Sequence, residues 1–263
     1  MGDFGTKHLM GLFWLSAVIF LALVILLRFR KAKGKGTSYD LWVIRGAALF
    51  MWGWELVKTV YMIRAESFGG IGNYPAFMLP LHICSMALYA YVVIGFFPGR
   101  LADFLKPFGY ATMMLVTSII LVIPASSGIL GNRPDWAFVS ENIMPFQSFF
   151  YHGSLIFVPL YMVLSGFYRP KVKDTGKAVV ALFSTALVAF VSNKLLMVTD
   201  FMMLEVGNGN PFQSMVESSY GLYVLILASV AVFGTFVVLG VSELFLMLSK
   251  TALFGQKKAE QTR

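Results

Sequence analysis

The residues of this chain best suited to chemistry are its cysteine and two of its histidines. Cys84 is the single cysteine in 263 residues, His82 lies two positions before it, and His152 lies in a separate apolar stretch. A thiol and an imidazole together form the nucleophile and general base used for acyl transfer through a thioester. We therefore predict a catalytic site with Cys84 as nucleophile, His152 as base and His82 as a third member.

Each of these residues also has a simpler interpretation. A lone cysteine often acts as a small buried hydrophobic residue, and it excludes a disulfide within the chain. His82 and His152 are also residues that hydrogen-bond between membrane helices. Metal binding by the three would need a denser set of ligands. The sequence therefore predicts neither a metal nor another cofactor.

Six further polar residues occur in or beside apolar stretches, and we expect them to bind substrate: Glu55, Lys58, Gln147, Asn193, Lys194 and Tyr220. A charged side chain in mid-membrane costs about 2.5–3.5 kcal/mol, so such groups usually face one another or water. The amide of Gln147 or Asn193 would stabilise an oxyanion. In the alternative interpretation, the two lysines extend to the membrane surface, while Glu55 and Lys58, three residues apart, neutralise each other.

The spacing of His82 and Cys84 conflicts with a regular helix. Two residues correspond to about 200° of rotation, so both side chains face one site only if the backbone there is irregular. Pro80 supplies a cause, because it lacks an amide donor and disturbs the preceding turn. We therefore expect an irregular backbone around Pro80.

The composition indicates that these residues lie in a membrane. The chain is 58% hydrophobic and 13% charged with a mean hydropathy of +0.75, which is more apolar side chain than a soluble core hides. A membrane-spanning helix needs about 20 apolar residues, and backbone groups in lipid must be satisfied within each helix. We predict an all-α polytopic protein with seven transmembrane helices, at about 9–27, 41–63, 76–97, 104–124, 144–167, 178–197 and 220–248.

Basic residues predict the orientation of these helices. Five Lys and Arg residues follow the first apolar stretch directly, and others fill alternate connections and the C-terminal tail. By the positive-inside rule these segments are cytoplasmic, so the N-terminus is outside and the C-terminus is cytoplasmic. The net charge of +8 and pI of about 9.5 then reflect topology and contact with anionic lipid, and they do not indicate nucleic-acid binding. We expect a multi-pass protein of the cell membrane.

The chain shows no hydrophilic second domain, no Pro- or Ser-rich linker and no convincing internal repeat. Residues 1–263 are therefore expected to form one integral membrane domain. The sequence leaves the oligomeric state open.

Two short motifs resemble a known family. The segments Leu79-Pro80-Leu81-His82-Ile83-Cys84 and Gln147-Ser148-Phe149-Phe150-Tyr151-His152-Gly153 resemble the signatures of the YwaF-like integral membrane proteins, a bacterial group related to a eukaryotic multispanning lipid acyltransferase. The resemblance implies that Cys84 and His152 are catalytic. Where the family tends to have Asn-Tyr in the sixth helix, this chain has Asn193-Lys194, and Ser219-Tyr220-Gly221 replaces a Gly-Pro-Trp-Pro stretch.

Together these features predict an enzyme that moves acyl chains between phospholipids and lysophospholipids at the outer leaflet. The alternatives are a small-molecule transporter or channel, which would need polar groups along its whole path, and a seven-helix sensor. A retinal-type sensor would need a lysine deep in the last helix, and 220–248 contains none.

The charge pattern makes a direct prediction about topology. A reporter fused to the C-terminus is expected to give a cytoplasmic signal, because the basic residues of 28–35, 169–177 and 250–263 hold those segments inside. A reporter at the N-terminus serves as the control and is expected outside. A C-terminus on the outer side would contradict both the orientation and the outer-leaflet site.

Overall fold

The computed structural model describes residues 6–32, 34, 36–64, 76–122, 139–197, 201–204 and 213–261. Within these ranges every regular element is helical, which agrees with the predicted all-α class. The elements are α1 (Thr6–Ala32), α2 (Thr37–Arg64), η2 (Ala76–Met78), α3 (Met86–Phe96), α4 (Arg100–Pro107), η3 (Phe108–Thr112), α5 (Met113–Val122), α6 (Val139–Leu164), η4 (Val172–Asp174), α7 (Thr175–Leu196), η5 (Phe201–Met203), α8 (Gln213–Ser218) and α9 (Tyr220–Gln261).

Four helices in the described part of the chain are long and apolar enough to cross a membrane. They are Leu9–Ala32, Gln147–Leu164, Val172–Leu196 and Tyr220–Ser249, and Met86–Phe96 is a shorter apolar helix. Large apolar side chains such as Phe20, Phe233 and Phe245 are about two-thirds exposed, which suits helices surrounded by lipid. The chain is a helical membrane protein, whereas the count of seven spans and the orientation stay predictions.

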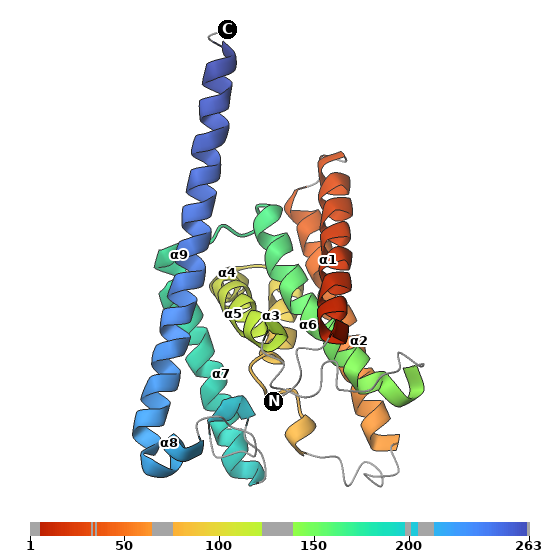
Figure 1. Cartoon of the computed structure of the whole chain (residues 1–263), viewed down its shortest axis with the longest axis vertical. Coiled ribbons are helices and arrows are strands. Elements are labelled where there is room, and N and C mark those ends of the chain that lie inside the picture. Colours follow the sequence, from red (N-terminus) through yellow and green to blue (C-terminus); the bar gives the residue numbers. More distant parts are fainter. Residues whose placement is uncertain are drawn as a thin grey trace.

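The helices stand side by side as a bundle (Figure 1). At its centre α2, α3 and α6 pack together with the π-helical segment η3 and with α7. Ile44, Leu88, Tyr91 and Leu155 are fully buried there. The helix α1 packs against α6 at one side, α9 packs against α7 at the other, and α9 projects beyond the rest (Figure 1).

The third predicted helix begins later than expected. Regular α-helix begins at Met86 instead of near residue 76, and the chain from Leu79 to Ser85 forms turns. Pro80 lies within this segment, so the irregular backbone expected from it is present. The amide of Ser85 bonds the carbonyl of His82 at 2.9 Å, as in a turn.

The next helical stretch, α4 to α5, contains a π-helical turn at η3, Phe108–Thr112. Widened turns of this kind leave a carbonyl free for another partner. The hydroxyl of Tyr91 on α3 donates to the carbonyl of Gly109 at 2.7 Å. This bond joins α3 to η3 inside the core.

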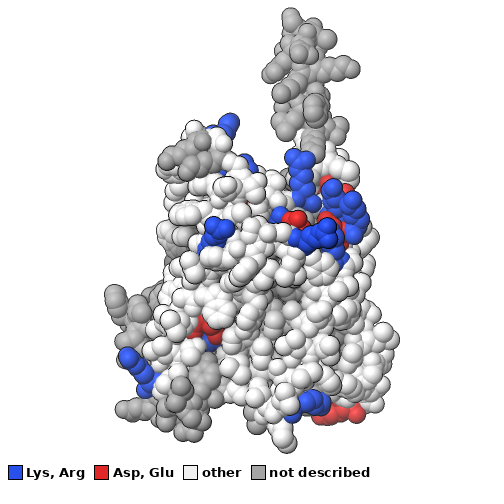
Figure 2. Space-filling model, turned by 180° about the vertical axis from the view of Figure 1, so that it is seen from behind, with Lys and Arg blue, Asp and Glu red and all other residues white. Residues whose placement is uncertain are grey.

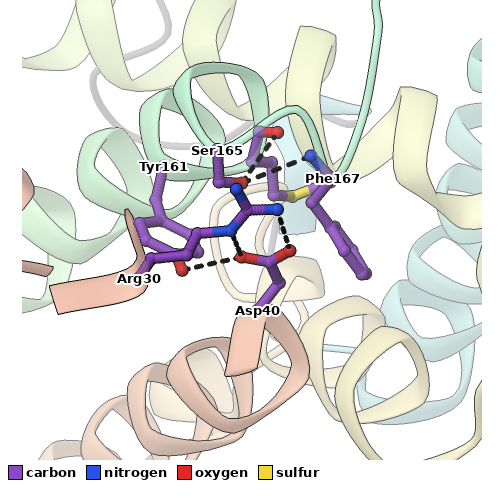
Figure 3. A network of polar contacts seen from close by, with 6 residues as sticks. Arg30, Asp40, Tyr161, Ser165 and Phe167 are labelled. Atoms are coloured by element: carbon purple, nitrogen blue, oxygen red, sulfur yellow. Dashed lines mark hydrogen bonds and ion pairs between the residues drawn. The ribbon is translucent and has the colours of Figure 1, made fainter. Parts of the chain in front are cut away.

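A buried ion pair joins α1 to α2 at the end where Ala32 and Thr37 lie. The guanidinium of Arg30 donates to both carboxylate oxygens of Asp40, at 2.7 and 3.0 Å. Tyr161 of α6 adds a third hydrogen bond to Asp40 at 2.9 Å (Figure 3). Asp40 is 1% exposed, so its charge depends on these partners.

Charged residues are distributed unevenly over the surface. In the view from behind, most of the visible Lys and Arg lie in the half from which α9 projects, and the middle of the molecule is almost free of charge (Figure 2). A wide uncharged zone is what a bilayer core requires. The distribution agrees with the charge pattern in the sequence.

The Asp40 network predicts a large stability effect. We expect Asp40→Ala to lower the free energy of unfolding by about 2–4 kcal/mol, because it leaves the Arg30 charge without its buried carboxylate. Thermal unfolding in detergent measures the change. Asp103→Ala is the matched control: this carboxylate is 69% exposed in its pair with Lys106, so its loss is expected to cost about 0–1 kcal/mol. Equal losses in the two variants would contradict a structural role for Asp40.

Candidate functional site

Cys84 lies directly before the N-terminus of α3. It is half-buried against the core, and the amide of the following residue, Ser85, is bonded to the carbonyl of His82. The positive end of a helix dipole favours negative charge. The break at Pro80 is what places this helix end inside the bundle. The backbone around the thiol is therefore suited to a thiolate or to an oxyanion formed beside it.

Tyr151 connects the cysteine to the histidine of α6. Its hydroxyl donates to the carbonyl of Cys84 at 3.0 Å, and its ring meets the ring of His152 edge to face at 5.6 Å between centroids. The side chain is 4% exposed. Tyr151 thus holds the turn that carries Cys84 against α6.

His152 has a fixed hydrogen bond at one ring nitrogen. Its Nδ1 lies 2.7 Å from the carbonyl oxygen of Ser148 and 3.2 Å from the Ser148 hydroxyl. A carbonyl oxygen only accepts, so Nδ1 carries the proton and Nε2 of the neutral ring carries the lone pair. This tautomer is the one a general base needs.

Cys84 and His152 do not hydrogen-bond each other directly in this structure. Catalytic contacts are often long before substrate binds and shorten only in the complex. The link that the structure does show runs through Tyr151.

Glu55 and Lys58 form a buried ion pair beside the cysteine. Lys58 Nζ lies 2.5 Å from Glu55 Oε1 and donates to the carbonyl of Met78 at 3.0 Å. Among the described residues, Glu55 Oε1 has no hydrogen-bond partner and contacts only the ammonium of Lys58. Both charges lie near enough to Cys84 to act on it electrostatically. The ion pair given above as the alternative interpretation of Glu55 and Lys58 is therefore present beside Cys84, while their binding of substrate stays a prediction.

His82 occupies the same turn but faces a different neighbour. Its ring packs edge to face on Phe201 at 5.2 Å. The side-chain amide of Asn193 forms two hydrogen bonds with the backbone of Phe201. It accepts from the Phe201 N–H at 2.8 Å and donates to the Phe201 carbonyl at 3.3 Å. Asn193 thus acts on the site through Phe201 and His82, and its amide is engaged with the backbone.

The other three expected substrate-binding residues are arranged differently. Gln147 is 6% exposed and lies on α6, five positions before His152. Lys194 is exposed on α7, with its ammonium 5.4 Å from the Phe190 ring. Tyr220 is 43% exposed and donates to the carbonyl of Leu204 at 2.9 Å. Lys194 and Tyr220 therefore lie at the periphery of this site.

Tyr151 was not among the predicted site residues. The available signal was helical spacing, because Tyr151 shares one face of α6 with the buried Leu155, Val158 and Met162. A tyrosine on such a face needs a partner for its hydroxyl. Nothing in the sequence identified that partner as the backbone of Cys84.

The described residues thus combine a polar site, set where α2, α3 and α6 meet, with an apolar helical bundle. These features define a multi-pass helical membrane protein with a candidate site in its described part. Residues 4–239 match the TMEM164 family, and the chain belongs to this family. No curated protein and no solved structure matches the chain. The more specific resemblance to YwaF-like proteins stays a prediction.

The hydrogen bond of Tyr151 predicts the reactivity of the thiol. We expect Tyr151→Phe to raise the alkylation rate of Cys84 by a small iodoacetamide about fivefold, because losing a bond worth about 1 kcal/mol loosens the turn. With one cysteine in the chain, total labelling of the detergent-solubilised protein reports on this position alone.

Tyr91→Phe is the matched control, because it removes a buried tyrosine bond to a different carbonyl, that of Gly109. Its alkylation rate is expected to equal that of wild type. The same increase in both variants would show that Tyr151 has no specific role at Cys84.

Proposed function

We propose that this protein is a lipid acyltransferase that moves acyl chains between phospholipid and lysophospholipid at the outer leaflet through Cys84 and His152. The observation that carries the proposal is the position of Cys84. Its thiol lies at the N-terminal end of α3 and packs against the core of the bundle. On α6, the ring of His152 offers Nε2 as a base.

The first half of the reaction acylates the cysteine. Nε2 of His152 takes the thiol proton, and the sulfur of Cys84 attacks the ester carbonyl of the donor phospholipid. In this scheme the positive end of the α3 dipole stabilises the resulting oxyanion. The intermediate collapses when the carbon–oxygen bond breaks, and the departing lysophospholipid oxygen takes the proton from His152.

The second half transfers the acyl group. The hydroxyl of a lysophospholipid attacks the thioester, its proton passes to His152, and the carbon–sulfur bond breaks. The sulfur recovers a proton from His152, so the enzyme returns to its starting state. In this scheme Tyr151 positions the turn and the Glu55–Lys58 pair sets the charge around it.

The main alternative from another class is a transporter or channel. A conducting path needs polar groups along its length. The groove of about 390 Å³ between α1, α2 and α6 has an almost wholly apolar lining, in which Ser154 is the one side chain with a hydroxyl. That lining favours a lipid substrate over an ion or a polar solute.

Substitution of the two central residues tests the covalent mechanism. In vesicles containing donor phospholipid and labelled lysophospholipid, Cys84→Ser is expected to abolish transfer, because serine is a far weaker nucleophile. His152→Ala is expected to be as damaging, and the double variant scarcely worse, since residues that act as a unit are not additive. A labelled acyl group trapped on the wild-type protein is expected to be released by hydroxylamine, as a thioester is.

Helical content by circular dichroism controls for folding, since neither side chain carries a charge that holds the bundle together. If folded Cys84→Ser keeps full transfer activity, the covalent mechanism is wrong. His82 with His152 as a non-covalent acid and base pair then becomes the better explanation.

A further inference from the structure

An apolar groove runs along the outside of the bundle where α1 and α2 diverge. Both helices pack near α6, and the groove between them has a volume of about 390 Å³. Its lining includes Leu15 and Leu26 of α1, Trp42 and Gly46 of α2, and Phe150 and Phe157 of α6. A cavity of this size is within the range of small-molecule sites, about 300–1,000 Å³.

The groove continues past its first section. A second apolar hollow of about 360 Å³ shares Leu15, Val18 and Phe150 with it and extends to Trp14 and Phe149. Gly153 and Ser154, which also line the groove, directly follow His152 on α6. One end of the groove therefore lies on the same helical turn as the candidate base.

The other end of the groove is closed by contacts between α1, α2 and α6. Leu23, Val43 and Tyr161 are buried against one another there, and the Arg30–Asp40 pair clamps the two helices just beyond (Figure 3). The groove thus ends near this ion pair on one side and near the turn of α6 that carries His152 on the other.

The length of the groove fits one hydrocarbon chain. From Leu15 to Leu26 the lining extends along α1 for about 16 Å at 1.5 Å per residue. Half of a bilayer core is about 15 Å thick, which is the depth that one acyl chain fills. Small residues keep the groove wide, because Ala22, Gly46 and Ala47 all line it.

The lining of the groove is almost wholly apolar. The hydroxyl of Ser154 donates to the carbonyl of Phe150 on its own helix at 2.9 Å. A headgroup or an ion placed there would lose its hydration without gaining a partner. The fitting occupant is therefore a saturated or unsaturated hydrocarbon chain supplied by the surrounding lipid.

We propose that this groove binds the acyl chain of a phospholipid and that its depth selects chain length. The selection of chain length rests on the proposed transferase function, whereas binding of the chain does not. A chain in the groove leaves the rest of its lipid on the side of α6 that carries His152.

Photochemical labelling tests binding without requiring activity. The probe is a phosphatidylcholine with a diazirine on its acyl chain, mixed into phosphatidylcholine vesicles that hold the full-length protein, and labelled peptides are identified by mass spectrometry. We expect labelling within 15–26 and 42–50 that excess palmitoyl lysophosphatidylcholine suppresses. Labelling near Phe233 on the open face of α9 is expected to resist the competitor, because that surface is in contact with bulk lipid.

A substitution at Gly46 blocks the groove with little effect on the protein. A Cβ atom added at Gly46 meets nothing within 4 Å, and the same holds at Gly53, two turns along the same face of α2 but outside the groove. Gly46→Leu is expected to reduce the suppressible labelling about tenfold, since its side chain overlaps the bound chain. Gly53→Leu is the matched control and is expected to label as wild type.

The outcomes separate this inference from the proposed function. The groove is not an acyl site if the competitor fails to suppress the labelling. The same holds if Gly46→Leu and Gly53→Leu are labelled equally, even where transfer is active. Suppressible labelling in a protein that shows no transfer supports the groove and contradicts the transferase. Where suppressible labelling and transfer are both observed, the donor-chain preference of Gly46→Leu tests selection by groove depth. A shift of this preference toward shorter chains supports selection, and an unchanged preference overturns it.

Discussion

A chain that interrupts a helix inside a membrane must find partners for the backbone groups that the interruption exposes. Between Met78 and Met86 this requirement is met partly by local turns and partly by side chains from other helices. Lys58 of α2 donates a hydrogen bond to the carbonyl of Met78, and Tyr151 of α6 donates one to the carbonyl of Cys84. The arrangement of α2, α3 and α6 around the cysteine depends on these two bonds. The same interruption that costs regular hydrogen bonds also creates the helix end at which the thiol lies.

The helix α2 carries one buried ion pair near each of its ends. Glu55 and Lys58 neutralise each other beside Cys84, while Asp40 pairs with Arg30 at the opposite end. Buried pairs of this kind add little net stability compared with apolar residues, but breaking one is costly, so they fix a single arrangement of their helices. In this protein the first pair places two opposite charges beside Cys84. The second joins α1 to α2 just beyond the apolar groove.

The helical membrane class could be predicted from hydropathy, and the irregular backbone near Cys84 could be predicted from Pro80. The late start of α3 at Met86 could not be predicted from the sequence, because the turns before it depend on partners from α2 and α6. Glu55 and Lys58 were identifiable as a pair because three-residue spacing fixes their neighbourhood on one helix. The roles of Tyr151 and Asn193 depend on how separate helices face each other, which spacing within one segment does not determine. The groove is a property of three helices together and has no sequence motif.

The π-helical turn at Phe108–Thr112 has a consequence for the helix that follows it. Bonding from i to i+5 accommodates one residue more than an α-helical turn, so the turn absorbs this residue and leaves α4 and α5 facing as they would in a regular helix. Deleting one residue there would restore an α-helical turn and keep the later side chains of α5 near their present orientation. Met113, which is fully buried, would stay in the core. The same deletion in the regular part of α5 would rotate every later side chain by about 100°, so this segment is the one place in the helix where the chain can change length by one residue without exposing its buried face.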